Sequence, residues 1–149
     1  MALALTDDIL SFTPPSGPAW RLPLARLAII AELTTDYGPD FDEWLMVFID
    51  TSGTVHYAGL TEQCTEPLAQ LRQQLNVQPD LVPQLWECMH LHSRILHPAP
   101  LREQPLFDFA DADPATLPSR LARLAAGEHA PDGRTLTPAV KAFLAPLAP

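Results

Sequence analysis

The stretch that decides the fold is residues 44–50, Trp-Leu-Met-Val-Phe-Ile-Asp, in which every position before the final aspartate is apolar. A short run of this kind, without polar alternation, is typical of a strand buried on both faces. The next residues, Thr51-Ser-Gly-Thr54, predict a short hairpin connection, and Val55–Leu60 predicts the returning strand. Because the connection is too short for a crossover, we expect the two strands to pair antiparallel.

The residues before this central strand also predict β structure. Ile9–Thr13 is a short candidate strand, and the proline-rich segment 14–18 is a turn or loop. Trp20–Thr34 ends in an alternating stretch with one uniformly apolar face, Leu27, Ile29, Ala31 and Leu33, and one mixed face, Arg26, Ala28, Ile30 and Glu32. Thr35–Asp42 then connects this strand to the central one. Residues 1–62 therefore predict an antiparallel meander of about four strands.

The remaining residues, 63–149, indicate mainly helices with proline-rich connections. Thr65 can cap a first helix, and a second is expected from Asp80 to about Leu96, where apolar residues recur at helical spacing. Shorter helices are expected over Pro118–Ala126 and after Thr137-Pro138.

The order of these elements predicts the fold class. Strands followed by helices indicate an α+β fold rather than an alternating α/β one. We expect residues 1–149 to form a single domain, in which an N-terminal antiparallel β-meander packs against C-terminal helices on one face of the sheet.

The charge of the chain excludes some partners. It carries 18 acidic and 9 basic residues, a formal net charge of -9. The bases are one lysine and eight dispersed arginines, so no basic stripe can displace counterions from nucleic-acid phosphates or bind an anionic membrane. We expect neither nucleic acid nor a membrane as a partner, whereas a basic protein would be attracted. The alternative is that moderate acidity simply keeps the protein soluble.

Neither a membrane span nor a secretion signal is predicted. The longest apolar runs, Leu27–Ala31 and Trp44–Ile49, fall far short of the ~20 residues that cross a bilayer. The first eight residues carry acids and no base, unlike a signal peptide. Two cysteines, Cys64 and Cys88, do not make a disulfide framework in a chain of 149 residues. Free thiols favour a reducing compartment, so the expected location is cytoplasmic.

Residues of the kinds that bind metal ions cluster in and just after the second half of the predicted second helix: Glu87, Cys88, His90, His92 and His97. Zinc prefers cysteine and histidine, and Cys88 and His92 lie four residues apart and would share one helix face. A third ligand would have to come from His97 or from another segment, such as His56 or Cys64. No paired-cysteine spacing accompanies them, so no metal or cofactor is assigned, and Cys88, His92 and His56 stand only as metal candidates. The alternative interpretation is that Cys88 is a small buried hydrophobe.

Covalent catalysis has little support in the sequence. No Gly-x-Ser-x-Gly elbow occurs, and the six glycines form no phosphate-binding cluster. Cys64, between a predicted strand and a predicted helix, is the best available nucleophile, but a buried structural thiol is the favoured interpretation. No catalytic residue is assigned.

The connection before the central strand is the candidate interaction surface. It combines acids with two aromatic rings: Asp36, Tyr37, Asp40, Phe41, Asp42 and Glu43. Exposed rings beside acids at a hairpin tip form a reasonable protein-contact surface. The segment lacks the dense ligand alternation and fixed glycine of a calcium loop. The alternative is an ordinary solvated loop.

Two stretches resemble segments of a group of small bacterial proteins that carry no assigned activity. These are residues 32–48, ELTTDYGPDFDEWLMVF, and residues 93–98, SRILHP, with Pro105-Leu-Phe107 after them. At the level of fold, a strand meander followed by a helix resembles a pleckstrin-homology-like domain, which implies a binding module. The strands here lack a basic pocket for an inositol phosphate, and several helices follow the meander where such a domain has one.

These observations favour a small, soluble, non-catalytic protein-interaction module of an immunity- or adaptor-like kind. The alternative is a small-molecule- or metal-binding protein, or a minor enzyme, that uses the Cys/His cluster. A third hypothesis is a homo-oligomer formed through a sheet edge or the leucine-rich C-terminal helices.

Overall fold

The computed structural model describes residues 2–15, 17–38, 41, 44–59, 64–76 and 90–148. Its strands are β1 (Ala2–Thr6), β2 (Ile9–Thr13), β3 (Trp20–Pro23), β4 (Leu27–Thr34), β5 (Trp44–Asp50), β6 (Val55–Gly59), β7 (His92–His97), β8 (Phe107–Phe109) and β9 (Arg134–Leu136). Its α-helices are α1 (Thr65–Gln74), α2 (Leu117–Ala125) and α3 (Pro138–Leu144). The short 3-10 helices in the described residues are η1 (Leu24–Arg26), η3 (Ala99–Leu101), η4 (Pro114–Thr116) and η5 (Ala145–Leu147).

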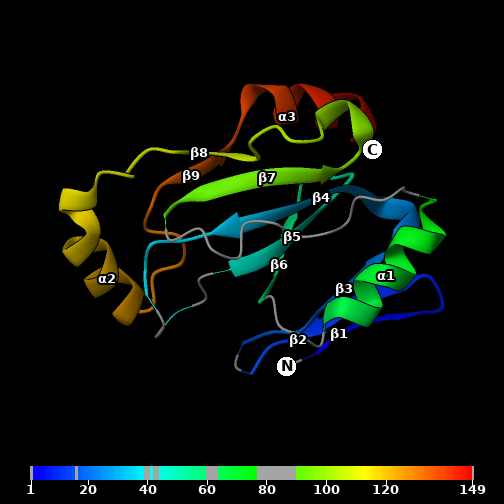
Figure 1. Ribbon diagram of the computed structural model, residues 1–149, viewed down its shortest axis with the longest axis horizontal. Coiled ribbons are helices and arrows are strands. Elements are labelled where there is room, and N and C mark those ends of the chain that lie inside the picture. The colour runs from blue at the N-terminus through cyan, green and yellow to red at the C-terminus, as the bar shows by residue number, and fades with distance from the viewer. Residues whose placement is uncertain are drawn as a thin grey trace.

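A four-stranded antiparallel sheet forms the centre of the molecule, in the order β6-β5-β4-β7 (Figure 1). Its two inner strands, β4 and β5, are buried along nearly their whole length. Ile30 pairs with Phe48 and Ala31 with Val47, so neighbouring positions supply opposite faces of the sheet. Because both sets of side chains are apolar, both faces need a covering layer.

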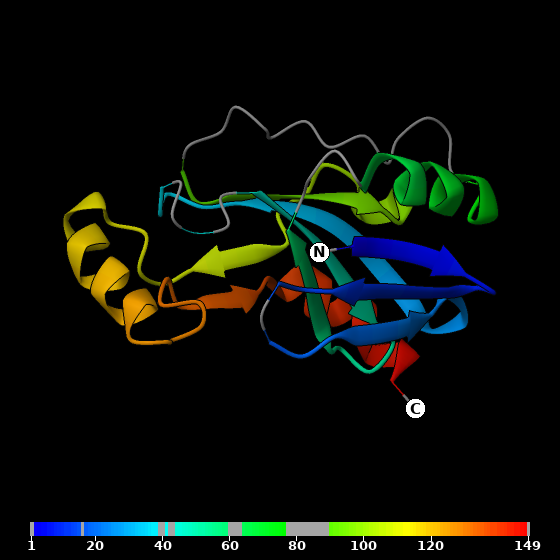
Figure 2. The same cartoon turned by 90° about the horizontal axis from the view of Figure 1, so that it is seen from below.

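One face is covered by a second sheet and by α1. Strands β1, β2 and β3 form a three-stranded antiparallel meander, and Figure 2 shows it lying across the central sheet. Leu10 and Leu22 of this meander and Leu71 of α1 pack with Ile30 and Phe48 in one hydrophobic cluster. The two sheets and α1 therefore share the first core.

The opposite face is covered by the last third of the chain. Strands β8 and β9 form a short antiparallel ribbon, and α3 lies over the same face of the sheet (Figure 1). Val140 of α3 packs with Ile29 and Val47 in the second core. Thr137 caps α3, because its hydroxyl accepts a hydrogen bond from the Val140 amide.

The predicted α+β class and an antiparallel N-terminal meander, β1-β2-β3, are confirmed, but residues 2–59 form the six strands β1–β6 in two sheets and not about four strands in one. Helices α1, α2 and α3 also form where helices were predicted. The prediction that the helices cover a single face is wrong, because α1 belongs to the first core and α3 to the second. The cause is the apolar character of β4 and β5 on both faces, which one layer of helices cannot cover.

The face assignment of β4 is confirmed at three of the four predicted positions. Ile29, Ala31 and Leu33 all lie in the second core, as the alternation predicted. Leu27 instead packs against the first core. The pairing with β5 shifts register between Leu27 and Ile29, and such a bulge reverses the alternation on its far side.

The predicted helix from Asp80 to about Leu96 is wrong where the structure describes it; residues 77–89 lie outside the described part. His92–His97 is strand β7, paired antiparallel with β4. A short apolar segment fits a helical stripe and a strand equally well, so periodicity could not separate the two. The pairing satisfies the backbone donors and acceptors of β4, which is buried and would otherwise leave them without partners.

Phe48→Ala should lower the free energy of unfolding by about 3–5 kcal/mol, because Phe48 is fully buried where the two sheets meet. Chemical denaturation followed by circular dichroism measures the change. Leu147→Ala is the control, since Leu147 is 41% exposed and its loss removes little buried surface. Equal midpoints for the two variants would contradict the central position of β5.

Candidate functional site

The predicted interaction surface lies at the end of the sheet where β4 leads into the connection to β5 (Figure 1). The structure describes Asp36, Tyr37 and Phe41 of this surface. The other residues lie outside the described part: Asp40, Asp42 and Glu43. The rings of Tyr37 and Phe41 meet edge-on with centroids 6.5 Å apart, and Phe41 is partly exposed. An accessible ring therefore lies beside the acidic connection, as predicted for Phe41.

The prediction that Tyr37 is exposed is wrong. Tyr37 is only 7% exposed, and its hydroxyl donates a hydrogen bond to Oδ2 of the fully buried Asp132. Asp132 also accepts two hydrogen bonds from the guanidinium of Arg134, at 2.9 and 2.8 Å. A phenol, a carboxylate and a guanidinium thus satisfy one another away from water. The Tyr37 side chain therefore lines the inside of the site and does not form part of its outer contact surface.

A second polar link joins this end of the sheet to α2, which projects beyond it (Figures 1 and 2). The side chain of Arg120 on α2 is fully buried. Its guanidinium donates two hydrogen bonds to the Asp36 carboxylate, at 2.7 and 3.0 Å, and lies 5.8 Å from the centre of the Tyr37 ring. Thr116 and the carbonyl of Asp113 accept further hydrogen bonds. Because an unpaired buried arginine is very costly, the Asp36 pair holds α2 to the sheet.

These groups keep fixed protonation states near neutral pH. Hydrogen bonding to Asp36 raises the pKa of Arg120. Burial opposes the charges of Asp132 and Arg134, but their mutual hydrogen bonds outweigh it, so the pKa of Asp132 falls and that of Arg134 rises. Burial, together with the hydrogen bond to Asp132, raises the pKa of Tyr37 to about 12. Two ion pairs with a neutral phenol between them therefore persist over the physiological range.

A cavity of about 160 Å³ lies against this network, between the end of β4 and β5, β6 and the loop from α2 to β9. Its apolar wall consists of rings and leucines: Tyr37, Phe41, Leu45, Tyr57 and Leu124. His129 also lines the cavity, with its ring edge-on to Tyr57 at a centroid distance of 5.3 Å. Burial, and then the charge of Arg134, lowers the pKa of His129, so the imidazole is neutral at pH 7.

The loop that carries His129 is strained. Ala130, the next residue and part of the same cavity wall, has φ 54°. This left-handed conformation costs an alanine about 1–2 kcal/mol, since its Cβ crowds the backbone carbonyl. Strain of this kind gathers at functional sites, where the surrounding structure holds it in place.

Sequence reasoning missed three residues of this site: Arg120, Asp132 and Arg134. One signal was available for Arg120. It lies three residues after Leu117 and four before Leu124, so it shares the apolar side of α2. An arginine on such a stripe indicates a buried ion pair, because arginine is almost never fully buried without a partner.

The structure separates the metal candidates. His56 lies on β6 and His92 on β7, the two outer strands of the sheet, which are about 14 Å apart at the usual strand spacing. The pairing registers also offset the two residues along the strands, because His56 is level with Ile30 of β4 and His92 with Thr34. The predicted helix face shared by Cys88 and His92 is wrong, because His92 begins a strand; Cys88 lies outside the described residues. Within the ranges that the structure describes, no group of three His, Cys, Asp or Glu side chains could hold a metal ion.

A serine, an aspartate and a histidine meet at the β5–β6 turn, but not in a catalytic order. Asp50 accepts hydrogen bonds from Ser52 Oγ and from His56 Nε2. With the aspartate in the middle, the histidine cannot take the proton of the serine. The backbone amides of Ser52 and Thr54 also donate to Asp50, which identifies it as the residue that organises the tight turn.

Cys64 precedes α1 as predicted and occupies its N-cap position in place of Thr65. Cys64 is 2% exposed, and its Sγ lies 3.7 Å from the carbonyl oxygen of Gly59, to which it donates a weak hydrogen bond. Because it is enclosed in the first core, this thiol is not placed to attack a substrate. The geometry favours the structural interpretation.

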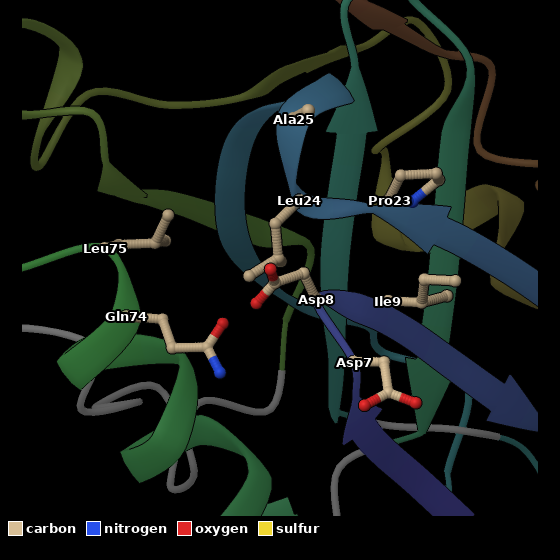
Figure 3. Close-up of a pocket in the computed structure, with 8 residues that line it drawn as sticks. All are labelled: Asp7, Asp8, Ile9, Pro23, Leu24, Ala25, Gln74 and Leu75. Atoms are coloured by element: carbon tan, nitrogen blue, oxygen red, sulfur yellow. The ribbon is translucent and has the colours of Figure 1, made fainter.

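A second cavity, of about 480 Å³, lies between α1 and the turn that joins β1 to β2 (Figure 3). Most of its lining is apolar: Ile9, Pro23, Leu24, Ala25 and Leu75. The carboxylate of Asp8 faces Gln74 at the end of α1, whereas that of Asp7 points away from the helix (Figure 3). Both aspartates have positive φ, 52° and 62°, a conformation that aspartate tolerates better than most residues.

None of the helices in the described segments is both long and apolar enough to cross a bilayer. Comparisons of the chain with protein-family models, with curated proteins and with solved structures found no match. The function is therefore argued from the geometry of the two cavities and the polar network.

Arg120→Ala should lower the free energy of unfolding by about 3 kcal/mol, because it leaves the Asp36 carboxylate without its buried partner. The Asp36 side chain is 16% exposed, so residual hydration keeps the loss at the lower end of the range for a broken buried pair. Denaturation measures the loss, and amide hydrogen exchange should be faster along α2.

Arg123→Ala is the matched control on the same helix. Arg123 pairs with Glu128 at the surface, and its removal should leave the midpoint near that of the wild type. If Arg120→Ala were as stable as this control, the Asp36–Arg120 pair would not hold α2 in place.

Proposed function

We propose that this chain is a small, non-catalytic, cytoplasmic protein-interaction module of an immunity- or adaptor-like kind. Its contact surface is the end of the sheet formed by the β4–β5 connection, α2 and the loop from α2 to β9. The observation that carries the proposal is the presence of two buried ion pairs there, Asp36–Arg120 and Asp132–Arg134. Buried ion pairs add little stability compared with apolar groups of equal volume, but they fix geometry. A surface held in one geometry binds a partner at a lower entropic cost.

The charge of this surface favours a basic partner protein. The net charge is -9, and the connection carries Asp40, Asp42 and Glu43 in addition to Asp36. Arg120 neutralises Asp36, so the attraction would come from the other three acids. The partly exposed ring of Phe41 adds the aromatic contact that is common in interface centres.

A basic protein is a better partner for this surface than nucleic acid, an anionic membrane or a second copy of the chain. Several of the arginines are already engaged by carboxylates: Arg94, Arg120, Arg123 and Arg134. A guanidinium in an ion pair is not free to displace counterions from phosphates. Two copies that each carry a charge of -9 repel one another, which disfavours a homo-oligomer compared with a basic partner.

Reversing the charge of the connection should weaken binding of a basic partner. Random peptides displayed on phage and selected on the immobilised full chain provide the probe, and we expect the selected peptides to be rich in Lys and Arg. Asp40→Lys with Asp42→Lys should reduce their affinity by about tenfold or more. Fluorescence anisotropy measures the change, and added salt should weaken binding to the wild type because it screens the attraction.

The matched control changes the net charge equally on the exposed side of α1. Glu66→Lys with Gln70→Lys and Gln73→Lys should leave the peptide affinity within about twofold of the wild type, since all three positions are exposed and lie on another element. Selected peptides that bind the Asp40/Asp42 variant as tightly as the wild type would refute the proposed contact surface.

A second candidate function is the binding of a small organic cation in the cavity beside α1 (Figure 3). Its volume of about 480 Å³ falls within the ~300–1,000 Å³ range of small-molecule sites. Apolar walls with the Asp8 carboxylate on one side suit an ammonium group on an apolar body. The carbonyl groups that end α1 add negative partial charge to the same side.

Hexylammonium should bind this cavity about tenfold more tightly than hexanol, because only the ammonium group gains a charge-assisted hydrogen bond. Asp8→Asn removes the charge but keeps a residue that tolerates the left-handed turn, so it should reduce hexylammonium to the affinity of hexanol. Calorimetric titration measures both. Equal affinities of the two compounds for the wild type would exclude this function.

A further inference from the structure

The cavity beside the Tyr37–Asp132–Arg134 network has the size of one side chain. Its volume is about 160 Å³, well below the ~300–1,000 Å³ of small-molecule and cofactor sites. An apolar cavity of about 150 Å³ holds a single benzene molecule. The available space therefore matches one aromatic ring or one branched aliphatic side chain.

The inside of the cavity favours a neutral occupant. Arg134 forms an ion pair with Asp132 and donates two hydrogen bonds to it. Asp132 also accepts a hydrogen bond from the Tyr37 hydroxyl. Partial burial of the His129 ring and the charge of Arg134 lower the pKa of His129, so its imidazole is neutral at pH 7. A charged group in this space would find no free opposite charge, and its desolvation would not be offset.

The surroundings of the cavity favour a basic neighbour instead. Two residues that line the cavity reach solvent: His129 is exposed, and Phe41, which belongs to the β4–β5 connection, is partly exposed. That connection carries the acids Asp40, Asp42 and Glu43 in its sequence. Lys or Arg residues next to the inserted side chain would be attracted by these acids.

A free molecule of this size would bind weakly. Burial of one side-chain-sized apolar group supports a dissociation constant no better than about millimolar. A side chain on a protein surface is in a better position, because all contacts of the interface share one loss of translational freedom. Buried anchors of this kind, surrounded by a polar rim, dominate the binding energy of many interfaces.

We infer that this cavity receives one neutral aromatic or branched aliphatic side chain of a partner protein, from a segment in which that residue has basic neighbours. The inference rests on the proposed interaction function and names the chemistry of the partner. The walls are held in advance by the Asp36–Arg120 and Asp132–Arg134 pairs, so the anchor enters a site that already exists.

The test uses phage-displayed random peptides selected on the full chain. The selected peptides should share one Phe, Trp, Leu, Ile or Met beside Lys or Arg, and replacing that residue with Ala should weaken binding by about tenfold or more. Leu124→Phe, which puts a ring into the cavity from α2, should have a similar effect. Ala125→Phe is the matched control, because Ala125 is exposed on the same helix and should change the affinity by no more than about twofold.

A second variant is used if Leu124→Phe destabilises the protein. If thermal unfolding shows that Leu124→Phe is destabilised, His129→Trp blocks the cavity from an exposed position that tolerates a larger ring. Peptides that bind both filled variants as tightly as the wild type would overturn the inference. If the same peptides are weakened by Asp40→Lys with Asp42→Lys, the contact surface stands and only the anchor is refuted. Peptides unaffected by either change, or a selection that enriches none, would refute the surface as well.

Discussion

The burial of β4 and β5 on both faces is the constraint on which the rest of the structure depends. Two adjacent strands with apolar side chains above and below need two covering layers, and these come from opposite ends of the chain. The meander and α1 cover one face, and β8, β9 and α3 cover the other. Helix α2 and its loop to β9 form an excursion between the paired strands β8 and β9 of the second layer, and this loop lies beside the β4–β5 connection. The candidate site is a consequence of this two-sided packing.

Helix α2 is held by a different kind of interaction from the two cores. It projects beyond the sheet, and its leucines remain only half-buried: Leu117, Leu121 and Leu124. The side chain that it buries completely is Arg120, whose planar guanidinium meets both carboxylate oxygens of Asp36. A lysine could not make this two-point contact, so the orientation of the helix depends on arginine. A helix fixed by one polar pair is expected to open more readily than the packed cores.

The sequence predicted the elements whose signals are local and strong. The unbroken apolar run of β5, its hairpin with β6 and the Thr137 cap of α3 needed no knowledge of distant residues. Strand β7 could not be predicted, since its pairing with β4 depends on contacts more than fifty residues away along the chain. The buried position of Tyr37 depends in the same way on Asp132, which lies 95 residues away along the chain. The candidate surface was found in outline from its acids and rings, but its walls are supplied by residues after position 115.

The cavity itself argues for a purpose at this end of the molecule. Apolar wall surface that stays uncovered in a cavity of about 160 Å³ forgoes the stability that its burial would add. The strained backbone of Ala130 lowers the stability of the protein further. A larger side chain at a half-buried position of α2 could fill the space, and a glycine at residue 130 would relieve the strain. A chain selected for stability alone would be expected to make one of these changes. The persistence of the cavity, its strained wall and its ion pairs in one place is what selection for binding predicts.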